Sequence, residues 1–320
     1  MRRVFWPGSR RAEGAYRDEI CDRDATKSRG KRPQPWVRNF RGAVLSCVEP
    51  GNREQYAPDH EPCAGHPRRP LAPRAVRPRA PAPGEVVLLH AEVAEDPADL
   101  APLRALLSPE ETARAERYHF EADRARSITA RGVARWALAS MLGRAPASLS
   151  FQPGAHGKPA LRAAPQDLRF NYAHSGQAVL LAFARAREVG VDVEPLRAMP
   201  EAERIVARYF SPREVEAFRE APPPDRDRAF LNGWTRKEAF IKALGLGLLR
   251  NLGSFDVALK PGEEPRLLAT RDDPDEARRW SLAAFEPAPG YLGAAVVEGP
   301  PCAFRTCRLP RGAFRARGIG

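Results

Sequence analysis

The sequence lacks an uninterrupted apolar run of about 18 residues, the length that a membrane-spanning helix requires, anywhere in its 320 residues. Only five cysteines are present, at positions 21, 47, 63, 302 and 307, and they form no C-x-x-C pair. An odd number of cysteines spread over such a length is not a disulfide framework, and zinc sites built from cysteine use paired ligands. We therefore predict a fold held by a hydrophobic core, with no membrane partner.

Basic residues exceed acidic ones, but the excess is unevenly distributed. The chain contains 52 Lys or Arg and 40 Asp or Glu, a formal charge of +12. Residues 1–84 hold 18 of the basic and 9 of the acidic residues, so residues 85–320 carry a net charge of only +3. A large basic excess ordinarily points to nucleic acid or another acidic partner. Here it describes mainly the N-terminal segment.

Residues 1–84 also hold 12 of the 33 prolines, and their apolar clusters are too short to form a core. This composition predicts a disordered leader that ends in a Pro-rich linker. The leader contains no apolar stretch typical of a secretion signal, so we expect a cytoplasmic protein. An over-extended start or inert tail is one interpretation, and a flexible arm with a charge-based role is another.

From residue 85 onward, the pattern predicts an α+β fold with two similar lobes in one chain. A β-rich run opens at 85–93, helices begin at Ser108-Pro109 and near Asp123, and short strands follow up to residue 194. The order then starts again, with helices near 201–208, 211–219 and 227–243 and strands between 254 and 297. We assign 85–196 to the first lobe, 197–310 to the second and 311–320 to a tail.

Two acidic residues alternate with valines in the strand predicted at 188–194. Asp192 and Glu194 stand two positions apart, so their side chains share one face of the strand. Neighbouring carboxylates repel each other unless a cation relieves the repulsion, and such oxygen ligands suit Mg²⁺. Taken alone, the pattern fits a half-exposed strand with solvated acids better than half of a metal site.

The helix predicted at 227–243 carries a second group. Trp234, Glu238 and Lys242 recur every four residues, which lines them up along one flank of the helix. The acid could complete a metal site, and the lysine could bind a phosphate. By itself, the segment fits an amphipathic helix with an ion pair between residues four apart at least as well.

Two more segments complete the set. They are the loop Gly157-Lys158-Pro159 and the run Phe170-Asn171-Tyr172-Ala173-His174-Ser175-Gly176. A lone histidine is usually structural. Here, however, the patterns GKP, FNxxHSG, GVDVE and WxxKEAFxKxxGxGL follow one another in a single chain. Their chance occurrence in this order and spacing is very small.

On these motifs, residues 85–300 resemble the 4′-phosphopantetheinyl transferases, specifically the two-lobed type that activates surfactin synthetase, with a pseudo-twofold α+β fold. The resemblance implies Mg²⁺ ligands at Asp192, Glu194 and Glu238. It implies contacts to coenzyme A at six residues, namely Arg114, Ser127, Lys158, Asn171, His174 and Lys242. Catalytic roles are implied for Glu238, Lys242 and Glu214, the last as a general base. The Ser-Pro-x-Glu setting of Glu214 equally fits a helix N-terminus.

The sequence departs from the family pattern at three positions. Ala173 stands where a serine usually precedes the histidine, Glu111 occupies a position that is often basic, and Tyr172 replaces a smaller apolar residue. The first change removes a hydroxyl donor, and the second shifts phosphate binding toward Arg114 and Lys158. None of the three changes affects the carboxylates.

The resemblance implies an Mg²⁺-dependent enzyme that transfers 4′-phosphopantetheine from coenzyme A to a serine of an apo acyl or peptidyl carrier protein, releasing adenosine 3′,5′-bisphosphate. A metal ion and nearby cations can stabilise the negative charge that develops on this leaving group. We expect a monomer with no nucleic-acid partner. Two alternatives remain: a nucleic-acid-binding protein that uses the basic leader, and a family member that binds coenzyme A without transferring it.

Overall fold

The computed structural model describes residues 78–154, 156–162 and 167–315. Most of the predicted leader and the end of the predicted tail lie outside these residues. Within the described ranges, no helix is both long and apolar enough to cross a membrane. The elements are, in chain order, β1 (Glu85–Glu92), α1 (Pro97–Arg104), α2 (Pro109–Glu116), α3 (Glu121–Leu142), β2 (Phe151–Pro153), β3 (Pro159–Leu161), β4 (Leu168–Ser175), β5 (Ala178–Arg185), β6 (Val189–Pro195), α4 (Ala202–Tyr209), α5 (Pro212–Glu220), α6 (Arg226–Leu244), β7 (Phe255–Val257), β8 (Leu267–Thr270), β9 (Trp280–Phe285), β10 (Tyr291–Glu298) and β11 (Ala303–Arg308).

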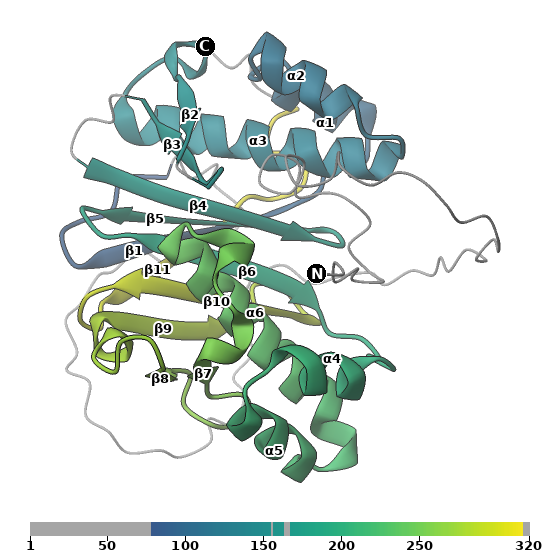
Figure 1. The fold of residues 1–320 in the computed structure, drawn as a ribbon. Helices are drawn as coiled ribbons and strands as arrows, with labels where there is room; N and C mark the ends of the chain where they lie inside the picture. Colours follow the sequence, from purple (N-terminus) through teal and green to yellow (C-terminus); the bar gives the residue numbers. More distant parts are fainter. Residues whose placement is uncertain (1–77, 155, 163–166, 316–320) are drawn as a thin grey trace, which may run out of the picture.

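Two sheets packed face to face form the centre of the molecule, and a long helix covers the outer face of each (Figure 1). The first sheet has the strand order β11-β1-β5-β4, and the second has β6-β10-β9. Helix α3 packs on the first sheet and α6 on the second. The result is a four-layer arrangement of helix, sheet, sheet and helix. The predicted α+β class with two lobes is confirmed.

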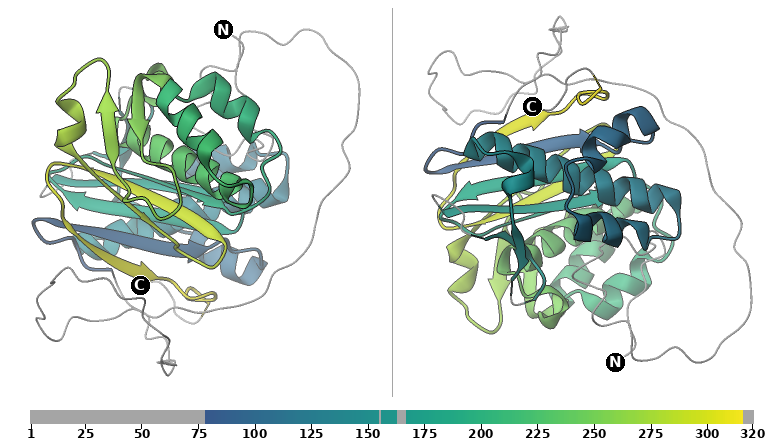
Figure 2. Two further views of the ribbon diagram at one scale, coloured as in Figure 1. Left: turned by 90° about the horizontal axis from the view of Figure 1, so that it is seen from below. Right: turned by 90° about the horizontal axis from the view of Figure 1, so that it is seen from above.

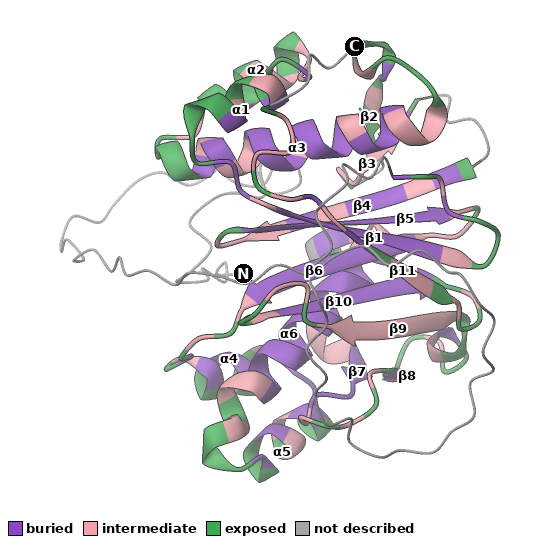
Figure 3. Ribbon diagram, turned by 180° about the vertical axis from the view of Figure 1, so that it is seen from behind, coloured by how far each residue is buried: buried purple, intermediate pink, exposed green. Residues whose placement is uncertain are grey.

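Strand β1 shows how the sequence produces these layers. Its side chains alternate between the two faces of the sheet: Val87 and Leu89 join the core beneath α3, whereas Val86 and Leu88 enter the core between the sheets. Both faces of the strand are thus buried, which explains why it reads as a continuous apolar run. Figure 3 shows the same burial along β5 and β6, with exposed residues concentrated on the outer helices.

The sheets cross the boundary that we predict between the lobes. Strand β6, placed in the first lobe by sequence, pairs antiparallel with β10 of the second sheet. Strand β11, placed in the second lobe, pairs parallel with β1 of the first sheet, and Figure 2 shows this C-terminal strand beside β1. The boundary at residue 196 stays a prediction, but each sheet draws a strand from the other side of it.

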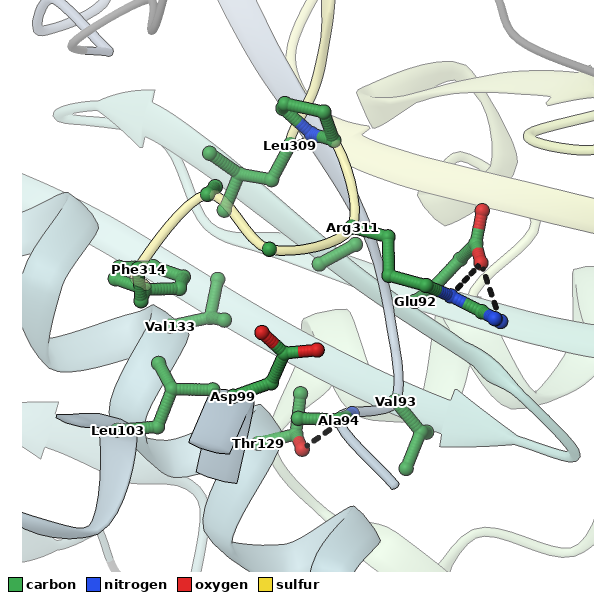
Figure 4. Close-up of a pocket in the computed structure, with 14 residues that line it drawn as sticks. Glu92, Val93, Ala94, Asp99, Leu103, Thr129, Val133, Leu309, Arg311 and Phe314 are labelled. Carbon is green, nitrogen blue, oxygen red and sulfur yellow. Dashed lines mark hydrogen bonds and ion pairs between the residues drawn. The ribbon is translucent and has the colours of Figure 1, made fainter. Parts of the chain in front are cut away.

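The chain beyond β11 is fastened to the first lobe. Arg308 and Arg311 pair with Glu92 at 2.5 and 2.9 Å, and Arg315 binds Asp99. This segment covers a cavity of about 30 Å³ whose wall includes Asp99 and Thr129 (Figure 4). A cavity of this size has room for one or two water molecules. It is therefore a packing defect beneath the C-terminal segment and too small for a substrate.

A structural repeat relates the two halves. Ser108 and Ser211 each cap a helix whose third residue, Glu111 or Glu214, returns a hydrogen bond to the capping backbone. Each glutamate then pairs with a cation of the following long helix: Glu111 with Arg135 at 2.5 Å, and Glu214 with Lys237 at 2.7 Å. In each half, the repeated feature consists of a capping box and a cation more than 20 residues later in the chain. Because so few residues take part, a direct comparison of the two half-sequences does not reveal it.

A single glycine sets the distance between α6 and the second sheet. A Cβ atom at Gly190 of β6 would lie 2.1 Å from the carbonyl oxygen of Ala239 and 2.2 Å from the amide nitrogen of Ala243. Both are backbone atoms of α6, which cannot move without the helix. Only glycine therefore allows α6 to lie directly on β6.

Substitution of Gly190 by alanine should force α6 away from β6. We expect the free energy of unfolding to fall by about 1–3 kcal/mol or more, the range for an overpacked core, as measured by urea unfolding. Gly253→Ala is the matched control, because its nearest atom would be 3.5 Å away. Equal stability of the two variants would contradict this account.

The core between the sheets contains one buried histidine. His90 of β1 is 5% exposed, and neither of its ring nitrogens has a hydrogen-bond partner among the described residues. Burial, assisted by the charge of Arg308, lowers the pKa of His90 to about 4. The unfolded chain retains the ordinary pKa of 6.5. As pH falls from 6.5 to 4, the unfolded state binds a proton that the folded state does not.

This difference predicts a loss of stability in that pH window of up to about 3 kcal/mol. Above pH 6.5, protonation of His90 should make no difference to the free energy of unfolding. Below pH 6.5, the free energy of unfolding should fall as the pH approaches 4. His90→Leu should flatten this dependence, measured by urea unfolding at several pH values. If the variant lost as much stability as the parent protein, the histidine would not be the cause.

Candidate active site

The two acids of β6 project toward α6. They share a face of the strand with Gly190, on which α6 lies, whereas the alternating valines enter the core between the sheets. Asp192 is 4% exposed and Glu194 is 8% exposed. The Nζ atom of Lys242 on α6 lies 2.6 Å from Oδ1 of Asp192. Glu238, one helical turn earlier, is 7% exposed. The strand and the helix thus bring Asp192 and Lys242 into contact, and they carry the other two predicted acids in buried positions.

Strand β4 of the first sheet contributes to the site from the side opposite α6. The hydroxyl of Ser175 donates a hydrogen bond of 2.7 Å to Oε2 of Glu194. Ser175 belongs to the FNxxHSG motif, but it is not among the site residues predicted from the sequence. In the sequence, the place of Ser175 directly after His174 in this motif is the feature that could have indicated a role in the site. Only the packing of β4 beside β6 gives this serine a carboxylate partner.

Asn171 links the two sheets. Its side chain is buried, and its Oδ1 accepts a hydrogen bond of 2.9 Å from the backbone N–H of Val191 in β6. This bond joins the edge strands of the two sheets next to Asp192. The structure thus gives Asn171 a role in holding the sheets together, and its contact with coenzyme A stays a prediction.

Lys158 reaches across the lobes from the loop between β2 and β3. Its ammonium lies 2.7 Å from Oε2 of Glu188 and 3.0 Å from the carbonyl oxygen of Ala243, near the end of α6. The helix dipole stabilises a cation near the C-terminal end of a helix. Burial lowers the pKa of Lys158, although Glu188 opposes this effect. A second predicted lysine therefore stands near the α6 end that carries Lys242.

The remaining predicted contacts lie farther out. His174 is half-buried at the end of β4, adjacent to Ser175. Ser127 is half-buried on α3, and Arg114 is exposed on α2. Both helices belong to the layer on the outer face of the first sheet (Figure 1).

Glu214 lies outside this constellation. It is 1% exposed, and its oxygens accept hydrogen bonds from the backbone N–H groups of Ser211 and Val257 at 2.9 and 2.8 Å. Lys237, itself fully buried, lies 2.7 Å from Oε2 of Glu214. Burial raises the pKa of Glu214 and lowers that of Lys237. Enclosed and fully engaged, Glu214 ties α5, α6 and β7 together, which argues against the predicted general-base role.

Glu111, a departure from the family pattern, has a comparable structural use. It pairs with Arg135 at 2.5 Å and lies 3.6 Å from Arg131. The guanidinium of Arg131 lies over the ring of Tyr172, 5.5 Å from its centre. The negative charge at position 111 is therefore balanced by α3, and Tyr172 packs against the same helix.

The three predicted acids form an acidic centre whose chemistry suits a cation. Its donors, Asp192, Glu194 and Glu238, are all carboxylates, and oxygen ligands of this kind are what Mg²⁺ prefers. In the described part of the chain, no three His, Cys, Asp or Glu side chains are already grouped to hold a metal ion. The ammonium of Lys242 lies on Asp192 instead. The donor chemistry fits Mg²⁺, but the ligands are not preassembled.

Comparisons with known proteins identify the family. A model of the 4′-phosphopantetheinyl transferase superfamily matches residues 188–296, and a model of the 4′-phosphopantetheinyl transferase N-terminal region matches residues 96–186. The chain is 35% identical to the 4′-phosphopantetheinyl transferase HetI of Nostoc over 217 residues, 67% of this chain and 88% of that protein. It is 32% identical to a Bacillus subtilis 4′-phosphopantetheinyl transferase, covering 58% of this chain and 85% of the relative.

The structural role of Glu214 and Lys237 predicts the effect of separating them. Lys237→Met should leave a carboxylate alone in the core and lower the free energy of unfolding by about 3–5 kcal/mol, measured by urea unfolding. The double variant Glu214→Gln/Lys237→Met should recover most of this loss. Lys260→Met is the control, because Lys260 pairs with Glu220 on the surface, and it should change stability little. A double variant no more stable than Lys237→Met would refute the pairing.

Proposed function

Because the chain belongs to the 4′-phosphopantetheinyl transferase superfamily, we propose that its acidic centre is where 4′-phosphopantetheine passes from coenzyme A to a serine of an apo acyl or peptidyl carrier protein. The observation that carries the proposal is the meeting of β6 and α6. There, Lys242 pairs with Asp192, while Glu194 and Glu238 are buried on the same strand and helix, and Lys158 stands near the same end of α6. Such a combination suits a pyrophosphate and its counter-ion.

Asp192, Glu194 and Glu238 would hold the Mg²⁺ ion. When bound, the ion would neutralise part of the negative charge of the pyrophosphate and of the leaving group. Without an ion, three neighbouring carboxylates would repel the phosphates of coenzyme A. The ammonium of Lys242 on Asp192 already offsets part of this charge, and the same lysine would remain close to the phosphates.

The reaction joins the serine oxygen of the carrier to the phosphorus of the phosphopantetheine arm and breaks the bond to adenosine 3′,5′-bisphosphate. The serine must lose its proton as the new bond forms. Since Glu214 is enclosed within the second lobe, we assign acceptance of this proton to a carboxylate of the centre, with Glu238 as the candidate. Lys242 and Lys158 would stabilise negative charge on the leaving phosphate.

The adenine nucleotide would extend from this centre over the edge of β4. His174 at the end of β4, Ser127 on α3 and Arg114 on α2 would contact it there. Both lobes of a single chain contribute to the centre, so we infer that a monomer suffices. Function in the cytoplasm and without nucleic acid is part of the same proposal.

The proposal is tested by incubating the purified protein with coenzyme A, Mg²⁺ and a panel of apo carrier proteins. Intact mass spectrometry should show addition of one phosphopantetheine arm to a carrier. Glu238→Gln and Asp192→Asn should lower the rate by about 100-fold or more, since each removes charge that acts on the transition state. Glu203→Gln, an exposed residue of α4 paired with Arg219, is the control and should retain the parent rate.

Transfer by Glu238→Gln at the parent rate would refute the assignment of the centre. A protein that binds coenzyme A but modifies no carrier would refute transfer itself. Deletion of residues 1–77 should leave the activity intact. If the protein were instead a nucleic-acid binder, that deletion would abolish a salt-sensitive affinity.

A further inference from the structure

The turn between β4 and β5 is shaped by a side chain of the second sheet. Gly176 in this turn has φ +55°, in the left-handed region that glycine tolerates. A Cβ atom at Gly176 would lie 2.7 Å from the hydroxyl oxygen of Tyr291. Conformation and contact therefore both require glycine here. The hydroxyl of Tyr291 lies where a side chain would otherwise be.

Tyr291 also bonds to the turn. The backbone N–H of Gln177 donates a hydrogen bond of 2.9 Å to its hydroxyl oxygen. On the other side of the turn, the carbonyl oxygen of Gln177 accepts a bond of 2.9 Å from the N–H of Val93. The turn is thus held between the first lobe and β10. Tyr291 is therefore one of the residues that tie this turn to the second sheet.

The same tyrosine lies beside the acidic strand. Tyr291 begins β10 and pairs with Pro195 of β6, and the next residue, Leu292, pairs with Glu194. Ser175 directly precedes Gly176, and its hydroxyl donates a hydrogen bond of 2.7 Å to Oε2 of Glu194. The turn that Tyr291 holds therefore carries the hydroxyl that orients Glu194.

We propose that Ser175 and Tyr291 are positioning residues for Glu194: Tyr291 seats the turn, and Ser175 fixes the carboxylate, so that together they set the affinity of the acidic centre for a divalent cation. The inference rests on the proposed function, which makes Glu194 a ligand. A hydrogen bond to one oxygen of a carboxylate limits the rotation of the group and so sets the direction in which it can face a cation. Residues that form hydrogen bonds to a metal ligand, without contacting the metal, commonly affect the affinity of the site for the metal.

The test measures Mn²⁺ binding to the full-length protein in the presence of coenzyme A and without carrier, by electron paramagnetic resonance of free Mn²⁺. Ser175→Ala should raise the dissociation constant by about 10-fold. Ser175→Thr, which retains the hydroxyl, should restore most of the affinity. Tyr291→Phe keeps the ring and loses the acceptor for Gln177, and should weaken binding about threefold.

Two control variants lose comparable hydroxyl groups elsewhere. Ser281 donates a hydrogen bond of 2.8 Å to the carbonyl oxygen of Gly299, so Ser281→Ala matches the loss at Ser175 at a distance from Glu194. Tyr209→Phe, in α4, matches the change at Tyr291. Both should bind Mn²⁺ as the parent protein does. In transfer assays, Ser175→Ala should raise the Mg²⁺ concentration for half-maximal rate and leave the rate at saturating Mg²⁺ nearly unchanged.

The outcomes separate this inference from the proposed function. Parent-like Mn²⁺ affinity in both Ser175→Ala and Tyr291→Phe would overturn the inference and leave the transferase assignment standing. A lower saturating rate and a lower Tm without a change in Mn²⁺ affinity would reduce the two residues to structural supports and also overturn it. If the parent protein bound no Mn²⁺, both the metal assignment and the inference would fail.

Discussion

The close approach of α6 to β6 at Gly190 is the constraint on which the rest of the structure depends. The missing side chain lets the backbone of the helix touch the strand, so residues one or two positions away on each element are brought into contact. Asp192 follows Gly190 on the same face, and Lys242 precedes Ala243 at the contact. With a wider gap, the acids would face solvent and no ion pair would form between strand and helix.

The repeated capping glutamates show how one device serves two purposes. In each half, a glutamate that ends a capping box also neutralises a buried cation of the long helix. Burying such a pair costs desolvation energy that the attraction between the charges does not always recover. Each pair instead fixes the position of one helix relative to another, because the glutamate links the short helix to the long one. In the second half, Glu214 and Lys237 hold α6 against β7, so the helix presents its other flank to the acidic strand.

The centre is assembled at the seam between the sheets, and both lobes contribute. From the first lobe come Asn171, which bonds to the backbone of β6, Ser175, which bonds to Glu194, and Lys158, which reaches the end of α6. From the second come Glu238 and Lys242. Motion of one lobe against the other would therefore disturb every part of the site at once. The return of β11 to the first sheet adds a further tie that resists such motion.

The sequence by itself determined the α+β class, the two-lobed organisation and the segments that carry the acids and lysines, because strand alternation, capping boxes and helical spacing are local properties. Tertiary structure alone decided which of these residues meet. Glu214 and Asn171 occur in motifs that suggest contact with substrate, yet packing turns one toward Lys237 and the other toward β6. Ser175 and Tyr291 are 116 positions apart, and β11 joins a strand more than 200 residues earlier. Such partners are fixed by the folding of sheet on sheet, a long-range property that no local pattern encodes.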